Sequence, residues 1–337
     1  MLFEKAKIEA ACLKMGFYGP NGSGKTYTAS KVAIGLAKHI KAKKPCYFFD
    51  TETGSDFVLH LFKDAGVELV VAKRRSFGDL LDATKEAIEN SSVFLIDSVT
   101  HVWDELIESY KEEKKLSRLF VQHWMDIKPM WREFSELFVS APIHVIVCGR
   151  AGDVWEEEID ETGAKELKKT GTRMRTEKEL GYEPSLLVEM EIKRPTPKKW
   201  LHQAWVAKDR FDLLNFQTFE DPGFEEFLPH IKALNLGGVH KAFDKSDNTK
   251  KLFSNDKTGL ALAKKREALL DEIKSEITYQ FPGQDQVSKK AKADIIKEIF
   301  DTRSWVKVEQ IWEIETLENG LAAIKGKFEK EDSHATA

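Results

Sequence analysis

A glycine-rich stretch, GPNGSGKT over residues 19–26, constrains the fold more than any other feature of the sequence. It satisfies the pattern G-x-x-x-x-G-K-[ST], in which backbone N–H groups and the N-terminus of a following helix bind phosphate. Its glycines let the backbone turn around a phosphate without Cβ clashes. An apolar stretch over 12–18 precedes the motif, and apolar residues at helical spacing follow it over 26–39. The sequence therefore predicts a strand, a phosphate-binding loop and a helix in succession, rather than a chance glycine loop.

The positions of this loop have separate expected roles. Lys25 is expected to reach the β- and γ-phosphates of a nucleotide, and Thr26 to supply an oxygen to Mg²⁺. The residues expected to contact the nucleotide are Gly19, Pro20, Asn21, Gly22, Ser23, Gly24, Lys25, Thr26 and Tyr27.

Bulk properties narrow the function classes. The net charge of −4 and the pI near 6.2 give no global basic field, so a nucleic-acid site would have to be a local patch. Cys12, Cys46 and Cys148 lie in apolar stretches without a C-x-x-C pair, which favours buried thiols over a metal site or disulfide. The charged start and the absence of an apolar stretch of about 20 residues predict a cytoplasmic protein without a membrane partner.

The N-terminal part alternates strands with helices. Further strands are expected at 45–50, 67–71, 92–97 and 144–148, and helices at 76–90, 99–115 and 118–140, with Ser76 as an N-cap. This order predicts an α/β fold whose central, mostly parallel sheet is covered on both faces.

The pattern changes after residue 153. A polar hairpin insertion is expected over about 153–175, turning at Glu161-Thr162-Gly163, and strands at 185–192 and 200–208 are separated by Pro195 and Pro197. The expected domains are an ATPase core over 1–236, a basic polar linker over 237–259, a helical module over 260–330 and a tail over 331–337. The module is expected to hold helices at 260–279, 288–300, 306–314 and 317–326.

Two acids at strand ends are candidates for the chemistry. Asp97 ends the 92–97 strand and fits a role in holding Mg²⁺ through water, although it could be an ordinary strand-end aspartate. One large branch of P-loop ATPases activates water with a glutamate directly after this aspartate. Ser98 occupies that position here. The other candidate is Glu52, at the tip of the 45–50 strand, which is expected to lie beside the P-loop strand; the alternative is a charged strand end.

These features together resemble the phage and prophage RecA-like ATP-binding proteins of the AAA_24 type, which include recombinases acting on single-stranded DNA. The resemblance covers about residues 10–220. It rests on GPNGSGKT, DTE, FLIDS, the helix with Trp124 to Phe138 before VIVCGR, TEKELGYEPSLLVEME and VAKDRF. It implies a RecA-like fold, ATP and Mg²⁺ as ligands, and a bacterial host cytoplasm if the chain is phage-encoded. The helical end is similar to modules appended to phage recombination proteins, which implies a single-strand-binding or annealing protein as partner.

The resemblance also implies residue roles. Glu52 would activate water, and Arg150 would sense the γ-phosphate; Arg150 could equally be a solvated surface residue. Lys208 and Arg210 lie two apart, so on a strand they share a face. In RecA-like filaments such residues enter a neighbour's ATP site, which implies head-to-tail self-association into a ring or filament. The alternative for Lys208 and Arg210 is a solvated basic edge.

The sequence also bears on which nucleotide base is bound and on where single-stranded DNA would bind. Lys208-Asp209 is not a guanine-reading motif, because Ala207 precedes it and Arg210 follows, which favours ATP over GTP. Candidate loops for single-stranded DNA are residues 168–175, and the cations at 193–194 and 198–199 beside Trp200; a solvated hairpin and a core tryptophan are the alternatives. Helical spacing makes Trp103, Trp124 and Trp131 core residues rather than a base-stacking platform.

Three functions fit the sequence. The first is an oligomeric ATPase acting with single-stranded DNA in recombination or replication. The second is a P-loop switch or assembly ATPase that recruits a protein partner without DNA contact. The third, a small-molecule kinase, is weakened because no arginine-rich lid segment follows the P-loop domain.

Overall fold

The computed structural model describes residues 3–159, 165–243, 259–283 and 285–334. The chain forms two compact units, Met1–Asp244 and Lys245–Ala337. The expected turn at Glu161-Thr162-Gly163 and most of the expected linker, residues 244–258, lie outside the described residues.

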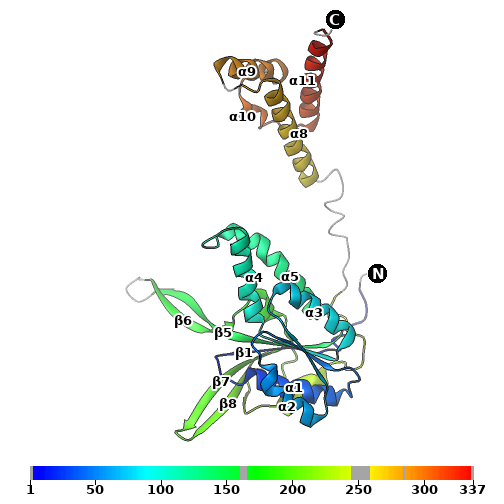
Figure 1. Ribbon diagram of the computed structural model, residues 1–337, viewed down its shortest axis with the longest axis vertical. Helices are drawn as coiled ribbons and strands as arrows, with labels where there is room; N and C mark the ends of the chain where they lie inside the picture. The colour runs from blue at the N-terminus through cyan, green and yellow to red at the C-terminus, as the bar shows by residue number, and fades with distance from the viewer. Residues whose placement is uncertain (1–2, 160–164, 244–258, 284, 335–337) are drawn as a thin grey trace. The chain divides into compact units, whose positions relative to one another are not determined.

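A nine-stranded sheet organises the first unit (Figure 1). Its strand order is β3-β2-β4-β5-β1-β7-β8-β9, and β6 pairs with β5. The five pairings from β3 to β7 are parallel, and β5–β6, β7–β8 and β8–β9 are antiparallel. The strands are β1 (Lys14–Gly19), β2 (Cys46–Asp50), β3 (Leu69–Lys73), β4 (Val93–Asp97), β5 (His144–Ile159), β6 (Lys165–Met174), β7 (Leu186–Thr196), β8 (Lys199–Asp209) and β9 (Thr218–Glu220). The predicted central, mostly parallel α/β sheet is confirmed.

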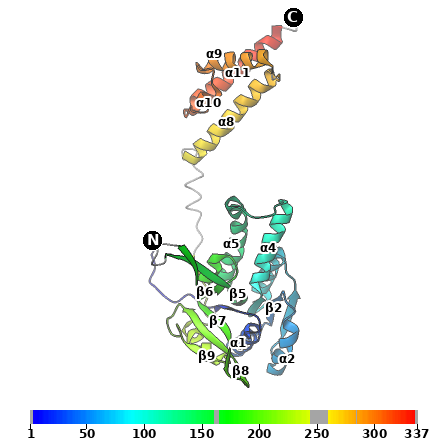
Figure 2. The same ribbon diagram turned by 90° about the vertical axis from the view of Figure 1, so that its left-hand side faces the viewer.

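Helices cover both faces of this sheet (Figures 1 and 2). One face carries α1 (Lys25–His39), α2 (Ser55–Ala65) and α6 (Leu228–Ala233), and the other carries α3 (Phe77–Asn90), α4 (Val99–Glu113) and α5 (Trp124–Ser140). Ser76 caps α3 as predicted, because its side chain accepts a hydrogen bond from Asp79 N.

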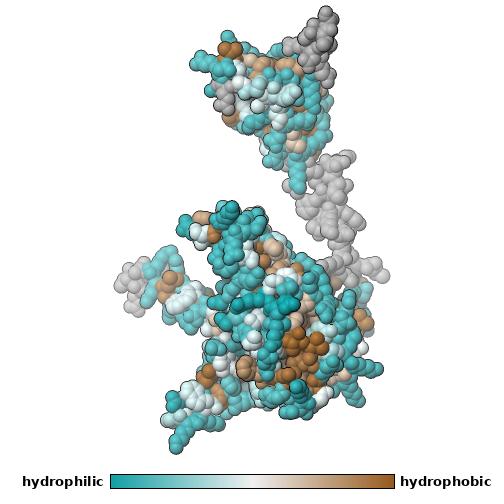
Figure 3. Space-filling view, viewed as in Figure 1, coloured by the Kyte–Doolittle hydropathy of each residue, from teal (hydrophilic) through white to brown (hydrophobic). Residues whose placement is uncertain are grey.

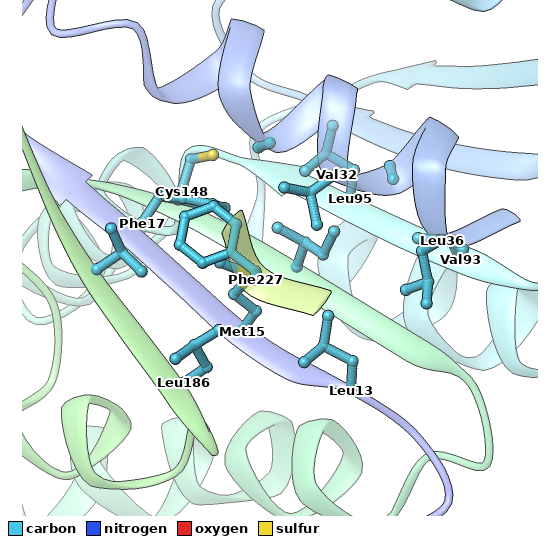
Figure 4. Close-up of a cluster of buried hydrophobic side chains, with 14 of the residues drawn as sticks. Leu13, Met15, Phe17, Val32, Leu36, Val93, Leu95, Cys148, Leu186 and Phe227 are labelled. Atoms are coloured by element: carbon cyan, nitrogen blue, oxygen red, sulfur yellow. The ribbon is translucent and has the colours of Figure 1, made fainter. Parts of the chain in front are cut away.

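Two apolar cores hold the layers together. Figure 4 shows part of the core on the α1 face, where side chains of β1, β4, β5 and β7 meet those of α1 and Phe227. On the α5 face, Trp103 and Trp131 are buried with ring centroids 5.1 Å apart, and Trp124 stacks on Trp103. The prediction that these tryptophans are core residues is confirmed for Trp103 and Trp131, whereas Trp124 is partly buried and packs against the core. Cys12, Cys46 and Cys148 are buried free thiols, also as predicted.

The β7–β8 hairpin is longer than the sequence indicates, and the β5–β6 hairpin pairs residues 151–159 with residues 165–174. β5 continues from the core through residue 159 into the β5–β6 hairpin, and β7 continues past Ile192 and Pro195 to Thr196. Pro195 is tolerated because it lies near the exposed end of a two-stranded hairpin, where an N–H need not serve a central ladder. The helices α2 and α6 and the strand β9 were not predicted.

A buried polar network joins α6 to the start of β7 and the end of β8. Asp209 Oδ1 lies 2.6 Å from His230 Nδ1, and His230 Nε2 lies 2.9 Å from Ser185 Oγ. Asp209 also accepts hydrogen bonds from the backbone N–H groups of Phe211, Leu213 and Leu214. Asp209 and His230 are fully enclosed, so this network fixes the fold and does not read a nucleotide base.

The second unit is helical. Its elements are α8 (Gly259–Gln280), α9 (Gln286–Phe300), α10 (Trp305–Val308) and α11 (Ile314–His334), packed around a core that includes Ile273, Val308 and Leu317. The predicted helix at 306–314 is wrong: only the four-residue α10 forms there, and Ile314 begins α11. None of the described helices is long and apolar enough to cross a membrane.

Candidate nucleotide-binding site

The glycine-rich loop joins β1 to α1 at the carboxyl edge of the sheet. Gly22 and Gly24 have φ angles of 75° and 85°, a region that favours glycine. A Cβ on Gly19 would lie 2.1 Å from the carbonyl oxygen of Met190 on β7, so a side chain there would displace the loop. Lys25 Nζ donates to the carbonyls of Gly19 and Pro20, at 3.1 and 2.8 Å. The ammonium therefore already lies within the concavity where a phosphate would bind.

Two oxygens meet beside this lysine. Thr26 Oγ1 lies 2.5 Å from Asp97 Oδ2, although the residues are 71 positions apart. Burial raises the pKa of Asp97 to about 6, and the neighbouring Glu52 carboxylate adds to the rise. A hydroxyl and a buried, poorly solvated carboxylate are the hard oxygen donors that Mg²⁺ takes, usually together with water and substrate phosphates. Thr26 and Asp97 therefore fit Mg²⁺. The described part of the chain has no group of three or more His, Cys, Asp or Glu side chains that could hold a metal ion.

Asp50 shapes the segment that carries Glu52. Its buried carboxylate accepts hydrogen bonds from the backbone N–H groups of Glu52 and Gly54 at 3.0 and 3.1 Å, and from Ser55 N at 2.9 Å. These contacts fold residues 51–54 into a tight connection and begin α2. Glu52 is consequently held by the backbone, whereas Asp50 has no free oxygen to offer a ligand.

Glu52 lies between two donors. Its Oε1 is 3.0 Å from Arg150 Nη2 and 3.1 Å from His101 Nε2. Arg150 comes from β5 and His101 from the first turn of α4. The carboxylate is about one-third exposed, so one side of it faces the open cavity.

A directed chain of hydrogen bonds supports His101. Ser98 N donates to Thr51 Oγ1 at 2.8 Å, and Thr51 Oγ1 lies 2.9 Å from His101 Nδ1. Burial is the main cause that lowers the pKa of His101, which favours the neutral ring. We assign the tautomer with hydrogen on Nε2, because Nε2 then donates to Glu52 and Nδ1 accepts from Thr51 Oγ1, for which Nδ1 at 2.9 Å is a nearer acceptor than the Asp97 carbonyl at 3.2 Å.

The expected strand order around Glu52 is wrong in one respect. β2 is not beside the P-loop strand: β5 and β4 lie between β1 and β2. Glu52 still reaches the site because parallel strands end at one edge of the sheet, where Asp50 pairs with Asp97 and Asp97 with Cys148. The sequence shows which strands are parallel more readily than which are adjacent.

A cavity of about 420 Å³ collects these groups. Of the residues expected at the site, it is lined by Asn21, Gly22, Gly24, Lys25, Thr26, Tyr27, Glu52, Asp97 and Arg150. Gly19, Pro20 and Ser23 form the loop behind this lining. Sequence reasoning missed three groups: Phe57 and His202 on the wall, and His101 behind Glu52. The position of His101 one turn beyond Asp97 was the only local signal for it.

Lys208 and Arg210 lie outside this cavity. Both donate to the carbonyl oxygen of Tyr182, at 2.5 and 2.7 Å, so they do share a face. Lys208 pairs with Leu187 near the start of β7, whereas the P-loop lies beside Met190 and Ile192 farther along that strand. Burial and the nearby Arg210 charge lower the pKa of Lys208 to about 8.

Comparison with known proteins gives one match. A family model described as an AAA domain matches residues 11–211, which spans the P-loop, Glu52, Asp97, Arg150 and Arg210. No curated protein matches the chain.

Proposed function

The chain belongs to the AAA domain family, and from this membership and the cavity we propose that it is a Mg²⁺-dependent ATPase of RecA-like type. The observation that carries the proposal is the convergence of Lys25, Asp97 and Glu52 on one cavity from three separate segments. A phosphate-binding loop alone would support binding. A carboxylate with one side open to the cavity adds a group that can accept a proton from water.

The residues divide the work in this proposal. Lys25 releases its hydrogen bonds to the carbonyl oxygens of Gly19 and Pro20 and binds the β- and γ-phosphates instead. The loop N–H groups bind the remaining phosphate oxygens. Thr26 and Asp97 would hold Mg²⁺, which neutralises phosphate charge when bound. Glu52 orients and deprotonates the attacking water, and Arg150 turns from Glu52 toward the γ-phosphate.

We propose ATP rather than GTP as the substrate. The Lys208-Asp209 pair is the nearest approach to a guanine-reading motif, and Asp209 is enclosed by His230 and backbone donors. It therefore has no oxygen available to a base.

We further propose that the protein self-associates head to tail and acts with single-stranded DNA, as the phage recombinase-type resemblance implies. The cationic end of the β7–β8 hairpin favours the DNA partner. The helical second unit would recruit a single-strand-binding or annealing protein. The alternative is a switch or assembly ATPase that recruits a protein without DNA; ATP turnover stimulated by single-stranded DNA supports the first function, and its absence supports the second.

Lys25→Ala tests the nucleotide site. The variant should lose affinity for a fluorescent ATP analogue and lose phosphate release, because Lys25 is the lysine within the described phosphate cradle. The matched control is Lys38→Ala, an exposed lysine in the last turn of the same helix that does not line the cavity. Undiminished turnover of the Lys25 variant would remove the proposed function.

A further inference from the structure

We propose that the end of the β7–β8 hairpin, residues 193–200, is the surface that binds single-stranded DNA, and that the hairpin couples this binding to the P-loop. The proposal rests on the ATPase function proposed above and specifies its partner surface and regulation. Figure 1 shows that this hairpin and the β5–β6 hairpin project from the same edge of the sheet. The contacts of the two hairpins distinguish them.

The β7–β8 end carries unbalanced positive charge. Residues 193–200 hold four cations and no acid, and the space-filling view shows this end as mostly hydrophilic (Figure 3). Lys193 pairs with Glu191, but no described acid forms an ion pair with Lys198 or Lys199, which are exposed. Two lysine ammonium groups are therefore available to phosphates.

An exposed aromatic ring lies beside these cations. Trp200 is 61% exposed, and the Arg194 guanidinium lies 4.8 Å from the centre of its ring. Arg194 also donates to the carbonyl of Pro197 at 2.8 Å, which fixes it over the ring. A flat ring held next to cations suits a nucleobase that stacks while its phosphates contact the lysines. An acidic protein segment would pair with these cations but would leave the Trp200 ring without a stacking partner.

The β5–β6 hairpin lacks this surplus. Its sequence over 153–175 has seven acids against five cations. Lys165, Lys168 and Lys169 pair across the hairpin with Glu157, Glu158 and Asp153, at 2.8, 2.9 and 2.6 Å. A strand of DNA would have to displace these acids. The structure therefore favours residues 193–200 over residues 168–175, the other segment that the sequence suggested.

One face of the hairpin leads from this surface to the P-loop. Alternation places Ile192 and Arg194 on one face of β7, and Ile192 pairs with His202 on β8. A Cβ on Gly22 would lie 3.4 Å from Ile192 Cδ1, and one on Gly24 would lie 2.9 Å from His202 Cγ. His202 Nδ1 is buried and has no hydrogen-bond partner among the described residues. Ile192 and His202, which lie beside the loop glycines, are thus next along the hairpin to Arg194 and Trp200.

Coupling follows from this contact. When the loop closes around phosphates, a movement of Gly24 toward the hairpin must displace His202, because the space between them is too small even for a Cβ. Gly22 has room for a Cβ beside Ile192, so this second contact transmits only a larger movement. A strand bound at Trp200 would bias the same movement. The two affinities must then change by the same factor, so ATP analogue and DNA should each tighten the other.

The first test measures binding of a fluorescent oligothymidine to the full chain by anisotropy, over a range of salt. We expect Trp200→Ala and the double variant Lys198→Ala/Lys199→Ala to weaken binding about tenfold or more. The double variant should also reduce the salt slope by about 1.4, the value for two phosphate contacts on a single strand. The matched control Lys168→Ala/Lys169→Ala should bind as the wild type does. The proposal would be overturned if this control lost DNA binding while Trp200→Ala and Lys198→Ala/Lys199→Ala kept full binding.

The occupant is tested in the same assay. Equal affinity for polyglutamate, or tighter binding of an oligouridine RNA, would overturn single-stranded DNA as the partner. Wild-type chain that binds the ATP analogue but no DNA would overturn the hairpin proposal and leave the ATPase proposal standing. Wild-type chain that binds DNA through the tip but no nucleotide would overturn the ATPase proposal and the coupling.

The second test addresses coupling through His202→Ala. This variant should keep its affinity for oligothymidine without nucleotide, since His202 lies outside residues 193–200. Because His202 lines the nucleotide cavity, the ATP analogue is used at a concentration that saturates each variant. It should lose the tightening of DNA binding by an ATP analogue and the matching effect of DNA on analogue affinity. Coupling that survives in His202→Ala and in Ile192→Ala would show that the hairpin face does not transmit it.

Discussion

At the scale of single residues, the contacts of Glu52 separate a catalytic role from a supporting one. Arg150 reaches Glu52 across the cavity, whereas His101 lies behind it and is itself positioned by Thr51. His101 faces Glu52 and Arg150 from one side, with Arg75 and Asp104 also near enough to affect its charge. We therefore expect His101 to orient the carboxylate without touching nucleotide.

His101→Phe tests this positioning role. The variant should lower kcat about tenfold, because Glu52 loses the donor that fixes its orientation, while the Kd of an ATP analogue stays within about twofold. His101→Gln can still donate to Glu52 and should recover part of kcat. A fall in nucleotide affinity equal to the fall in kcat would mean that His101 acts on the fold of the site instead.

The predicted residues and the missed ones differ in how far apart their partners lie in the chain. Lys25 and Thr26 belong to a local motif, Asp97 ends an apolar strand and Glu52 follows one by two residues, so short stretches of sequence indicate them. His202 comes from β8 and meets Gly24 only after the sheet has formed. No spacing in the sequence connects these two residues.

At the scale of elements, β1 carries a buried charge at its start as well as the P-loop at its end. Lys14 Nζ donates to the carbonyls of Ala141 and Ile143 at 2.7 and 2.8 Å, where the chain passes from α5 to β5. Burial lowers the pKa of Lys14 to about 7. This lysine fastens the starts of two paired parallel strands.

The buried lysine predicts a pH dependence of stability. Between pH 7 and the unfolded-chain pKa of 10.5, the unfolded chain binds more protons at Lys14 than the folded chain does. The free energy of unfolding should therefore rise with pH across this window, by on the order of 3–5 kcal/mol at this site. The rise should be absent in Lys14→Met and present in the exposed control Lys43→Met, measured by denaturant unfolding at fixed pH steps. Parallel curves for Lys14→Met and wild type would contradict the assignment.

Hydrophobic periodicity predicted most of the helices and strands but not which strands are adjacent in the sheet. The strands at 45–50 and 92–97 were found because each is an apolar stretch that ends at an acid. Placing β5 and β4 between β1 and β2 depends on how α1 and the later crossover helices pack on the sheet, which the apolar pattern of a single element does not indicate. The length of the projecting β7–β8 hairpin was also missed, because exposed strands carry little apolar pattern.

At the scale of the whole molecule, the cavity has no cation from Lys208 or Arg210 of its own chain. If these residues act on ATP, they must act on a neighbour's, through a heterologous contact that builds a ring or a filament. Their shared acceptor, the Tyr182 carbonyl, holds both side chains at one point of the surface.

Self-association should therefore control turnover. Specific activity should rise with protein concentration, and Lys208→Ala/Arg210→Ala should lower it by about 10²-fold or more when every subunit carries the change. Mixed with Lys25→Ala subunits, the double variant should regain turnover at its own intact P-loop, because the partner supplies the cations. Turnover per subunit that stays flat down to the monomer range, or full activity of the double variant, would return these residues to a solvated edge.

The central claim is that Glu52 activates water at a Mg²⁺-dependent ATP site, and Glu52→Gln tests it most directly. The measurement is phosphate release with Mg²⁺, together with the affinity for a fluorescent ATP analogue, for the variant and the wild type. The predicted result is unchanged analogue affinity with turnover reduced by about 10²-fold or more, the scale of a lost acid–base group. Normal turnover by Glu52→Gln would contradict the mechanism.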